Sequence, residues 1–334
     1  MSTIRNILFY LTYGCGILLI IITLIAHLNT SQWYLEVLAF PCLLILIVLP
    51  IFGLVSLLFE PKKSYLFFIY IFLLITSEVL QVWSIFPYTP IAKKRVRSAT
   101  PNEITHLPVV GIIVSNVLMS NRNADLLLKL VSHKNPTLIL TMEVDRWWVN
   151  KLDVLNNKYP YRITFPTDNT YGMCLYSQYP LTEKKIFYLN NERVPSFLCK
   201  VTLNNGIAFQ LLTVHPVAPK PSKHPDNMGK VENGLIKAAY LIARREKVPT
   251  MVAGDFNDVG WSYNTAKFRA ISKLNDVRCG RGLYNTFRTN SLLLKWPLDY
   301  VYVSDEFRVV SLEKLANIGS DHYPFYAQLT FSNN

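Results

Sequence analysis

The most informative residues of this chain are two carboxylates and a carboxamide that follow a short apolar run. The run Val248–Ala253 leads into Gly254, after which come Asp255, Asn257 and Asp258. A buried strand that ends in this way delivers polar side chains to the rim of a sheet, where catalytic residues often lie. Gly, Asn and Asp are also the commonest turn residues, so an ordinary turn explains the same residues. The rest of the chain decides between these interpretations.

Further polar clusters, each beside an apolar stretch, favour the catalytic interpretation. A single Asn or Asp at a strand end is usually a cap or a turn former, and a single His is usually structural. A whole series of such clusters is hard to produce by chance. If the strands converge, the clusters gather carboxylates, carboxamides and imidazoles in one place. The further clusters are Asn116, Glu143, His215, Asp299 and the pair of Asp321 and His322.

This set of side chains suits one kind of chemistry. Carboxylate and amide oxygens are preferred by Mg²⁺ or Mn²⁺, and no cysteine belongs to the set. A hard divalent ion held by a few carboxylates is a means of handling phosphate oxygens and of activating water. A histidine beside a carboxylate then serves as a general base, or as a cation that stabilises charge on phosphorus. The residues therefore predict metal-assisted hydrolysis of a phosphoester.

The elements that must position these groups alternate between short β-rich stretches and amphipathic helices. Strands with helices between them occur in both halves of the region after residue 108, which predicts two packed β-sheets with helices on their outer faces. The predicted strands are 109–116, 136–143, 171–177, 181–188, 196–203, 207–215, 250–253, 298–303 and 325–331, and the predicted helices are 124–133, 147–156, 228–246 and 261–274.

The N-terminal quarter of the chain is of a different kind. Residues 7 to 86 are nearly all apolar, and they contain three segments of the roughly 20 residues that a transmembrane helix needs. A cleaved signal peptide would account for the first segment only, and the buried helices of a soluble core rarely occur three in a row. The sequence thus predicts transmembrane helices at 7–27, 34–59 and 65–86 within a region 1–90, a basic linker 91–107 and a catalytic domain 108–334.

Basic residues near these segments give opposing indications of orientation. Arg5, Lys62 and Lys63 favour a cytoplasmic N-terminus, whereas the basic stretch Lys93–Arg97 favours a cytoplasmic domain. Because the first helix usually dominates and long domains translocate regardless of charge, we expect an extracytoplasmic domain. The net charge of +12 fits a phosphate-bearing partner, whether a lipid surface, a nucleic acid or a smaller substrate.

The motifs stand in the order found in the endonuclease/exonuclease/phosphatase superfamily, which includes pancreatic-type DNases, abasic-site endonucleases, inositol-polyphosphate 5-phosphatases and neutral sphingomyelinases. The chain resembles this superfamily over about residues 108 to 332. Gly-Asp-Phe-Asn with a C-terminal Ser-Asp-His is specific, whereas the Asn and Glu motifs would be weak alone. The apolar N-terminus further resembles that of bacterial membrane-anchored members. The motifs are Val114-Ser-Asn116, Thr141-Met-Glu143, Tyr171-Gly172 with Ser177-Gln-Tyr-Pro180, Thr213-Val-His215-Pro216, Gly254-Asp-Phe-Asn257, Leu298-Asp299-Tyr300 and Gly319-Ser-Asp-His322.

The resemblance implies a fold and a metal site. The fold is a four-layer α/β sandwich of two mainly antiparallel sheets flanked by helices. Glu143 would be the principal ligand of Mg²⁺ or Mn²⁺, assisted by Asn116 and Asp321. The chain departs from the common pattern at Met142, where many members have Gln, and at Tyr300, where many have His. Neither departure removes a ligand or a reacting group, so neither argues against catalysis.

The resemblance also implies catalytic roles. His322, oriented by Asp299, would act on the attacking water or stabilise the transition state, and Asp255 would position or deprotonate that water. The division of work between Asp255 and His322 stays open. Asn257 would donate a hydrogen bond to a phosphoryl oxygen, and His215 would contact the scissile phosphate or protonate the leaving group. The residues expected to bind substrate are Asn116, Tyr171, Asn257 and His215.

The sequence as a whole predicts a membrane-anchored, Mg²⁺-dependent phosphodiesterase. Its substrate is either a nucleic acid or a phospholipid headgroup. A membrane tether and interfacial tryptophans at Trp147, Trp148 and Trp261 would suit a lipid, although core packing explains the tryptophans more simply. A nucleic-acid backbone would instead suit a basic strip made of Lys220, Lys223, His224 and Lys230.

An alternative from another class is a catalytically silent, membrane-tethered module that binds an anionic partner. Its signature would be loss of Glu143, Asp255 or His322, and the sequence retains all three. A transporter is disfavoured, because three spans without polar clusters leave little room for a substrate path. The predicted location is the bacterial inner membrane. The partners are a phosphate-bearing substrate and the lipid bilayer, and the sequence indicates no protein partner.

Overall fold

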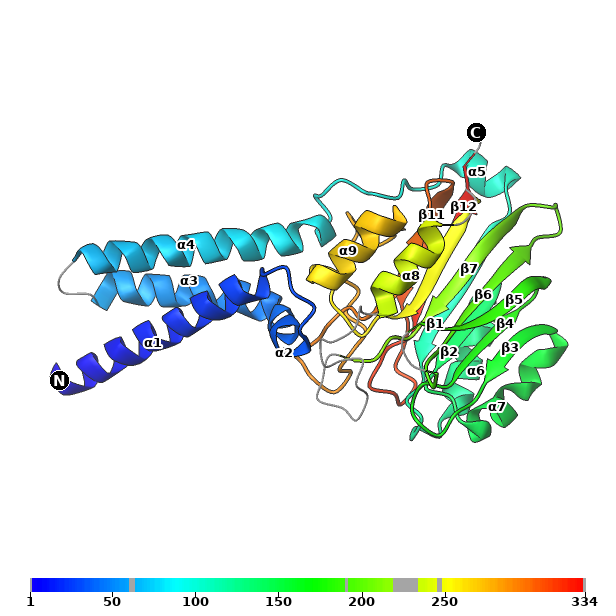
Figure 1. Cartoon of the computed structure of the whole chain (residues 1–334), viewed down its shortest axis with the longest axis horizontal. Helices are drawn as coiled ribbons and strands as arrows, with labels where there is room; N and C mark the ends of the chain where they lie inside the picture. The colour runs from blue at the N-terminus through cyan, green and yellow to red at the C-terminus, as the bar shows by residue number, and fades with distance from the viewer. Residues whose placement is uncertain (1, 60–63, 190–191, 219–233, 245–247, 333–334) are drawn as a thin grey trace.

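The computed structural model describes residues 2–59, 64–189, 192–218, 234–244 and 248–332 (Figure 1). A rod of N-terminal helices projects from a larger body that contains two β-sheets. The two sheets pack face to face, and helices cover both outer surfaces. The prediction of an α/β sandwich with helices outside the sheets is therefore confirmed.

Both sheets have six strands and mixed direction. The first sheet consists of β1 (Val109–Asn116), β2 (Leu138–Met142), β3 (Tyr161–Phe165), β4 (Met173–Ser177), β11 (Phe307–Lys314) and β12 (Phe325–Phe331). The second consists of β5 (Leu181–Tyr188), β6 (Pro195–Thr202), β7 (Ala208–Val214), β8 (Thr250–Asp255), β9 (Asn275–Asp276) and β10 (Asp299–Val303). Their orders are β11-β12-β1-β2-β4-β3 and β5-β6-β7-β8-β10-β9. The pairs β1–β2 and β7–β8 are parallel, whereas the other pairings are antiparallel, as expected of a mainly antiparallel sandwich.

Helices cover the outer faces because their apolar stripes meet the outward-facing side chains of the strands. On the first sheet, Leu127 packs in the same cluster as Ile139, and Trp148 is fully buried there, which confirms core packing for this tryptophan. On the second sheet, Phe268 meets Tyr302 edge to face. The covering helices are α6 (Ala124–Lys134), α7 (Arg146–Leu152), α8 (Gly234–Ala243) and α9 (Tyr263–Ser272). The predicted helix 228–246 is thus α8, and its positions 228–233 and 245–246 lie outside the described residues.

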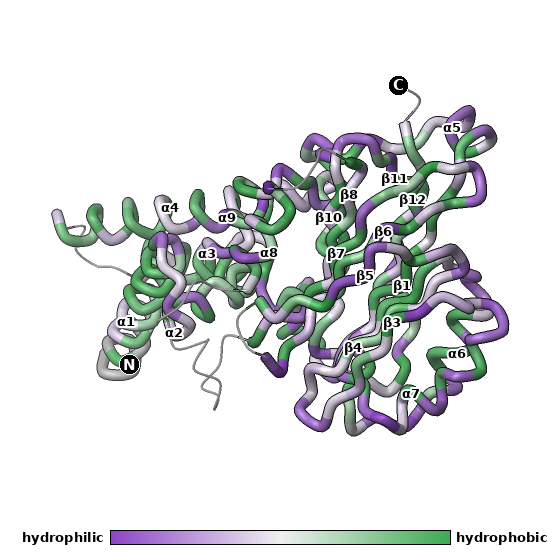
Figure 2. Tube along the Cα trace, turned by 45° about the vertical axis from the view of Figure 1, so that its right-hand side comes forward, coloured by the Kyte–Doolittle hydropathy of each residue, from purple (hydrophilic) through white to green (hydrophobic). Residues whose placement is uncertain are grey.

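The rod is built from α1 (Ser2–Ala26), α3 (Cys42–Phe59) and α4 (Tyr65–Ile85), and Figure 2 shows that they consist largely of hydrophobic residues. Among the described residues, one helix, Tyr65–Tyr88, is long and apolar enough to cross a membrane. A second qualifies only if a bent pair of helices counts as one span. The expectation of three transmembrane helices is therefore not supported by length and composition.

Two of the three predicted spans do not form a single long apolar helix in the structure. The span predicted at 34–59 is broken, because α2 (Trp33–Glu36) and the following turn to Ala39 stand at 63° to Cys42–Leu58. Pro41 sits at the break and has no N–H with which to continue the hydrogen bonds of the preceding turn. The span predicted at 7–27 falls within α1. The described apolar part of α1, Tyr10–Ala26, is shorter than a membrane-spanning helix requires.

The broken segment is held on the globular body by two tryptophans. The indole Nε1 of Trp261 donates to the carbonyl oxygen of Ala39 at 2.7 Å. The indole of Trp296 donates to the carbonyl of Phe40 at 2.6 Å, and the two rings meet edge to face. Trp261 thus contacts the chain's own N-terminal segment and packs against the buried cluster of Ala39, Val259 and Leu298.

The predicted basic linker also packs on the globular body. The Ala99 N–H donates to the carbonyl of Val309 at 2.8 Å, so the linker extends the edge of the first sheet at β11. Just before the linker, Tyr88 is buried, and its hydroxyl accepts a hydrogen bond from Arg269 at 3.1 Å. A short helix, α5 (Pro101–His106), follows the linker's extended part. The connection between rod and body is therefore a packed element.

Candidate active site

The strand ends that carry the predicted residues meet at one edge of the sandwich. Because β1 and β2 are parallel neighbours, Asn116 at the end of β1 and Glu143 just after β2 leave the first sheet at the same edge. In the second sheet, the register of β8 and β10 places Asp255 opposite Asp299. Hydrogen bonds connect the two sheets, since Asn116 Nδ2 donates to Glu143 Oε1 at 2.8 Å and to Asp255 Oδ2 at 3.1 Å.

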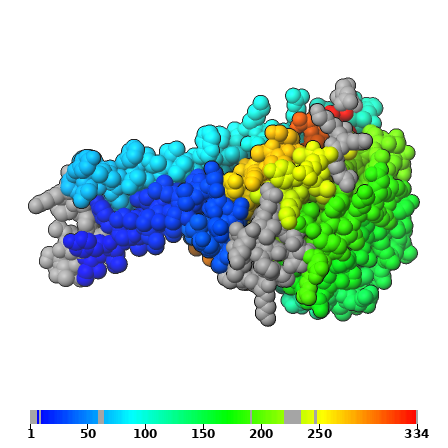
Figure 3. Space-filling view, in the orientation of Figure 1, coloured from blue at the N-terminus to red at the C-terminus, as the bar shows by residue number. Residues whose placement is uncertain are grey.

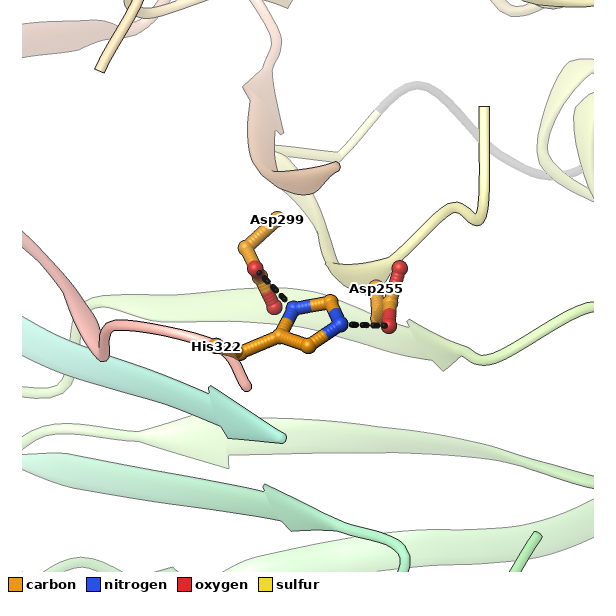
Figure 4. A group of neighbouring side chains, drawn as sticks. All are labelled: Asp255, Asp299 and His322. Carbon is orange, nitrogen blue, oxygen red and sulfur yellow. Dashed lines mark hydrogen bonds and ion pairs between the residues drawn. The ribbon is translucent and has the colours of Figure 1, made fainter. Parts of the chain in front are cut away.

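His322 lies between two carboxylates (Figure 4). Its Nδ1 is 2.8 Å from Asp299 Oδ2, and its Nε2 is 3.6 Å from Asp255 Oδ2. The side chain is only 4 % exposed. Burial alone would lower the pKa of His322, but the charges of Asp299 and Asp255 outweigh burial and raise the pKa to about 10. The imidazole is therefore positively charged at neutral pH.

The carboxylates of this edge crowd one another. Burial raises the pKa of Glu143; the hydrogen bond from Asn116 opposes that shift, and the charges of Asp255 and Asp321 add to it. Burial likewise raises the pKa of Asp255, against the opposing charge of His322. A group of buried, mutually repelling carboxylates gains stability from a cation placed among them.

The donor set fits a hard divalent cation. Asp255 and Asp299 offer carboxylate oxygens that lie, together with the imidazole of His322, within 4.8 Å of one another. Among the described residues, Asp299 Oδ1 is buried without a hydrogen-bond partner, so it has a lone pair to offer. Oxygen atoms predominate, as Mg²⁺ and Mn²⁺ prefer. The ligands predicted from the sequence adjoin this group, and they are Glu143, Asn116 and Asp321.

The residues predicted to bind substrate flank Asp255. His215 Nε2 is 3.9 Å from Asp255 Oδ2, and the ring of Tyr171 lies 5.2 Å from the imidazole of His215, centroid to centroid. The Asn257 N–H donates to Asp255 Oδ1 at 2.8 Å, and its side-chain amide donates to the carbonyl of Pro216 at 2.9 Å. The structure thus brings the predicted substrate-binding residues to the same edge as the metal and catalytic candidates.

Two glycines allow the backbone to pass closely behind the site. Gly254 has a φ of +151°, and a Cβ there would lie 1.8 Å from the carbonyl oxygen of Val214. A Cβ on Gly172 would lie 1.8 Å from the carbonyl oxygen of Val144, the residue after Glu143. Any side chain at either position would push the neighbouring backbone away, so these glycines fix where the catalytic strand ends lie.

Sequence reasoning missed two residues that support the site. The Ser320 hydroxyl donates to the carbonyl of Asn116 at 2.8 Å and accepts from the His322 N–H at 3.0 Å, which ties the two predicted segments together. Its place inside the Ser-Asp-His motif could have revealed it. Phe287 lies against the ring of His322, with centroids 4.8 Å apart. Nothing in the sequence around Phe287 signals this contact.

The two departures from the family pattern have structural explanations. Met142 is buried, and its Sδ accepts a hydrogen bond from the Asp255 N–H at 3.1 Å. The Tyr300 hydroxyl donates to the carbonyl of Asp258 at 3.0 Å. The guanidinium of buried Arg278 lies 3.7 Å from the centroid of the Tyr300 ring. Both side chains therefore support the strands that carry the acids.

Donors for a hard cation beside a charged imidazole, gathered where two sheets meet, are characteristic of hydrolases that act on phosphoester bonds. Comparison with family models agrees with this class. The model described as "Endonuclease/Exonuclease/phosphatase family" matches residues 113–322, which is more than half of the chain, and the chain belongs to this family. Members of the family are generally hydrolases of phosphoester bonds and typically depend on a divalent metal ion.

Solved structures show the same fold. The catalytic domain of human Nocturnin with bound sulfate is 17% identical, with 70% of this chain and 100% of that chain covered and a TM-score of 0.54. A family protein from Bacteroides thetaiotaomicron is 16% identical, with coverages of 68% and 100% and a TM-score of 0.53. D. rerio TDP2, humanized by 14 mutations, is 15% identical, with coverages of 66% and 98% and a TM-score of 0.51. A search of curated protein sequences found no significant match.

Proposed function

We propose that this chain is a membrane-anchored, divalent-metal-dependent phosphodiesterase that hydrolyses its substrate by attack of water. The observation that carries the proposal is the position of His322, 2.8 Å from Asp299 and 3.6 Å from Asp255. This group adjoins the hydrogen-bonded pair of Asn116 and Glu143. Attack on phosphorus needs an acceptor for the proton of water, a fixed positive charge and ligands for a metal ion, and this edge provides all three.

The raised pKa of His322, about 10, favours different catalytic roles for His322 and Asp255. An imidazole that is already protonated at neutral pH cannot accept the proton of water, so we assign His322 to the stabilisation of charge on phosphorus. We assign the acceptance of that proton to Asp255, whose pKa burial raises. As water adds to phosphorus, the bond to the leaving oxygen breaks and His215 protonates that oxygen, which yields a phosphomonoester and an alcohol.

In this proposal Glu143, Asn116 and Asp321 hold Mg²⁺ or Mn²⁺. A bound ion would polarise a phosphoryl oxygen and offset its negative charge. Asn257 and Tyr171 flank the acids and would contact the substrate phosphate. A catalytically silent module is the weaker candidate, because the chain keeps every group that the reaction requires. The predicted basic strip of Lys220, Lys223, His224 and Lys230 lies outside the described residues.

Metal dependence is tested on the full chain in detergent micelles. The substrates are a soluble chromogenic phosphodiester, plasmid DNA, RNA, inositol phosphates, a phospholipid and sphingomyelin. We expect turnover of at least one phosphodiester in Mg²⁺, complete loss in EDTA and recovery when Mg²⁺ is restored. Turnover that EDTA leaves intact would exclude the metal. Metal binding without turnover of any substrate would instead favour the silent binding module.

The exposed apolar surface of the rod supports the membrane anchor. Leu66, Phe72 and Trp83 on α4 are 74%, 67% and 79% exposed. An exposed apolar surface of this kind is more stable in contact with lipid than with water. The polar side chain of Gln81 turns inward instead, where its amide donates to Thr23 Oγ1 at 2.9 Å. We propose that α3 and α4, with α1 beside them, hold the chain in the bacterial inner membrane.

We further propose that the catalytic domain lies outside the cytoplasm, because Arg5, Lys62 and Lys63 flank the predicted spans in the sequence and favour a cytoplasmic N-terminus. A reporter enzyme that folds only after export, fused after Asn334, is then expected to be active in cells. A reporter that functions only in the cytoplasm, fused at the same position, should be inactive. The reverse pattern of activities would place the domain in the cytoplasm.

A further inference from the structure

The loop between Arg288 and Lys295 presents two leucines to solvent. Leu292 is 93% exposed, more than any other large apolar residue in the described part of the chain, and Leu293 is 79% exposed. Isolated exposed leucines are common on protein surfaces, but two adjacent leucines at the tip of one loop form a small apolar patch. The segment 287–297 contains no Asp or Glu. The place of this loop in the fold indicates what the patch contacts.

The loop lies at the end of the body from which the rod projects. Trp296, the residue after Lys295, donates its indole N–H to the carbonyl of Phe40, which is two residues before α3. In Figure 1 the orange segment that leads into β10 runs beside α2. Figure 3 shows the globular body meeting the blue N-terminal segment on this side. The two leucines therefore belong to the same loop as the tryptophan that contacts the N-terminal segment.

The base of the same loop forms part of the active site. The backbone N–H groups of Arg288 and Thr289 donate to the carbonyl of Asp321 at 2.8 and 3.1 Å. Phe287 contacts the ring of His322 and also stacks on Trp296, with centroids 6.0 Å apart and ring planes at 27°. One short segment thus touches the catalytic histidine at its base, the membrane end of the chain through Trp296, and solvent through its leucines.

Basic side chains occur on both sides of the two leucines in the same loop and at the end of β11. The guanidinium of Arg288 lies 5.8 Å from the ring centroid of Trp296. The ammonium groups of Lys295 and Lys314 lie 5.7 and 4.7 Å from the ring centroid of Tyr323, which follows His322 in the chain. Apolar tips flanked by cations and aromatic rings are the composition that binds the interface of an anionic bilayer. A nucleic-acid backbone would attract the cations but would make no favourable contact with exposed leucines.

We propose that Leu292 and Leu293 insert into the bilayer that holds the helices, and that the substrate is therefore a phosphodiester in the headgroup of a membrane lipid. This inference rests on the proposed phosphodiesterase activity and specifies its substrate class. Insertion of the loop presents the edge that carries His322 and Asp321 to the plane of the lipid phosphates. Water then cleaves the headgroup phosphodiester, which leaves an alcohol on one product and a phosphomonoester on the other.

The test uses the full chain reconstituted into anionic phospholipid vesicles with Mg²⁺. Two rates are measured, hydrolysis of the vesicle phospholipid and hydrolysis of a soluble chromogenic phosphodiester. In the double variant Leu292→Ser with Leu293→Ser, we expect the ratio of lipid to soluble turnover to fall by about tenfold or more. The matched control is Val154→Ser, a 62% exposed residue after α7, which should leave that ratio as it is. An unchanged ratio in the double variant, or turnover of nucleic acid but not of lipid, would overturn the proposal.

A second measurement does not depend on activity. In a Cys15→Ser background, a fluorophore attached at Leu292→Cys should be quenched by lipids that carry a quencher, whereas one at Val154→Cys should not. Equal quenching at both positions would overturn the membrane contact. If contact is found but no substrate is turned over, the proposed phosphodiesterase fails while the membrane contact stands. If turnover occurs without contact at Leu292, the proposed phosphodiesterase activity is supported and the proposed insertion of the loop is wrong.

Discussion

Replacing Glu143 by glutamine is expected to abolish metal-dependent turnover while leaving the fold intact. Glutamine has the same shape and can still accept the hydrogen bond from Asn116, which is 2.8 Å long in the native chain. It lacks the negative charge with which Glu143 would hold a cation beside Asp255 and Asp321. Loss of supporting groups around a metal site typically costs about 10- to 100-fold in affinity or activity, so loss of a principal ligand should exceed about 100-fold.

The expected stability of Glu143→Gln separates a catalytic effect from a structural one. Burial raises the pKa of Glu143, with a smaller addition from two neighbouring acids and against the hydrogen bond from Asn116, so without metal its ionised form is less favourable in the folded state than in the unfolded chain. Glutamine removes that penalty, and the midpoint of thermal unfolding in EDTA should stay the same or rise. Titration of Mg²⁺ should no longer stabilise the variant. The control is Glu313→Gln, whose half-exposed carboxylate pairs with Lys134 far from the site. Normal metal affinity together with a loss under about tenfold would remove Glu143 from the metal site.

The pattern of apolar runs predicted most of the sandwich, because its strands are buried and bounded by turn residues. The prediction for β5 coincides with the observed strand, Leu181–Tyr188. Three of the described strands were missed: the two-residue β9 (Asn275–Asp276) and two longer strands whose sequences lack that pattern. β3 (Tyr161–Phe165) is mostly solvent-exposed or half-buried, and β11 (Phe307–Lys314) alternates irregularly around a bulge at Val309. Exposed edge strands carry little hydrophobic signal, so only their pairing in the fold reveals them.

The N-terminal region was mispredicted for a related reason. Hydropathy does not distinguish an apolar segment that spans lipid from one that docks on a protein surface. The segment that ends at Phe40 docks on Trp261 and Trp296, two residues more than 200 positions away in the chain. Long-range contacts of this kind cannot be predicted from the composition of the local sequence. For the same reason Phe287 was missed, since its contact with His322 depends on the path of a loop rather than on a motif.

The candidate site was more predictable than these contacts, because most of its residues lie at a strand end or within two residues of one. Strand direction alone brings Asn116 and Glu143 to one edge, and the register of β8 with β10 places Asp255 opposite Asp299. What the sequence could not predict is the charge state of His322, which depends on two carboxylates brought within 4 Å by separate strands. That charge state is what favours Asp255 as the base in the proposed reaction.

Replacing His322 by alanine is expected to lower turnover by about 10²- to 10⁴-fold, because the variant loses the positive charge beside the phosphate. Alanine also leaves Asp255 and Asp299 buried without their counter-charge, which destabilises the fold. His322→Asn, which keeps a polar donor in place, therefore accompanies it. The control is His133→Ala on the exposed side of α6. Near-native rates in both His322 variants, measured on protein with a normal unfolding transition, would remove His322 from the mechanism.

The pH dependence of Asp299→Asn distinguishes a cationic His322 from a basic one. If catalysis needs the imidazolium, the rate is retained below the pKa of His322 and is lost as the pH rises through it, near pH 10 in the native chain. Asp299 is the largest contribution that raises this pKa against the effect of burial, so the neutral variant must lower the pKa. The alkaline fall in rate should then move toward neutral pH in Asp299→Asn. A general base would behave in the opposite way, because a lower pKa would extend activity toward acid. A rate–pH profile of the variant beside the native protein therefore decides the role of His322.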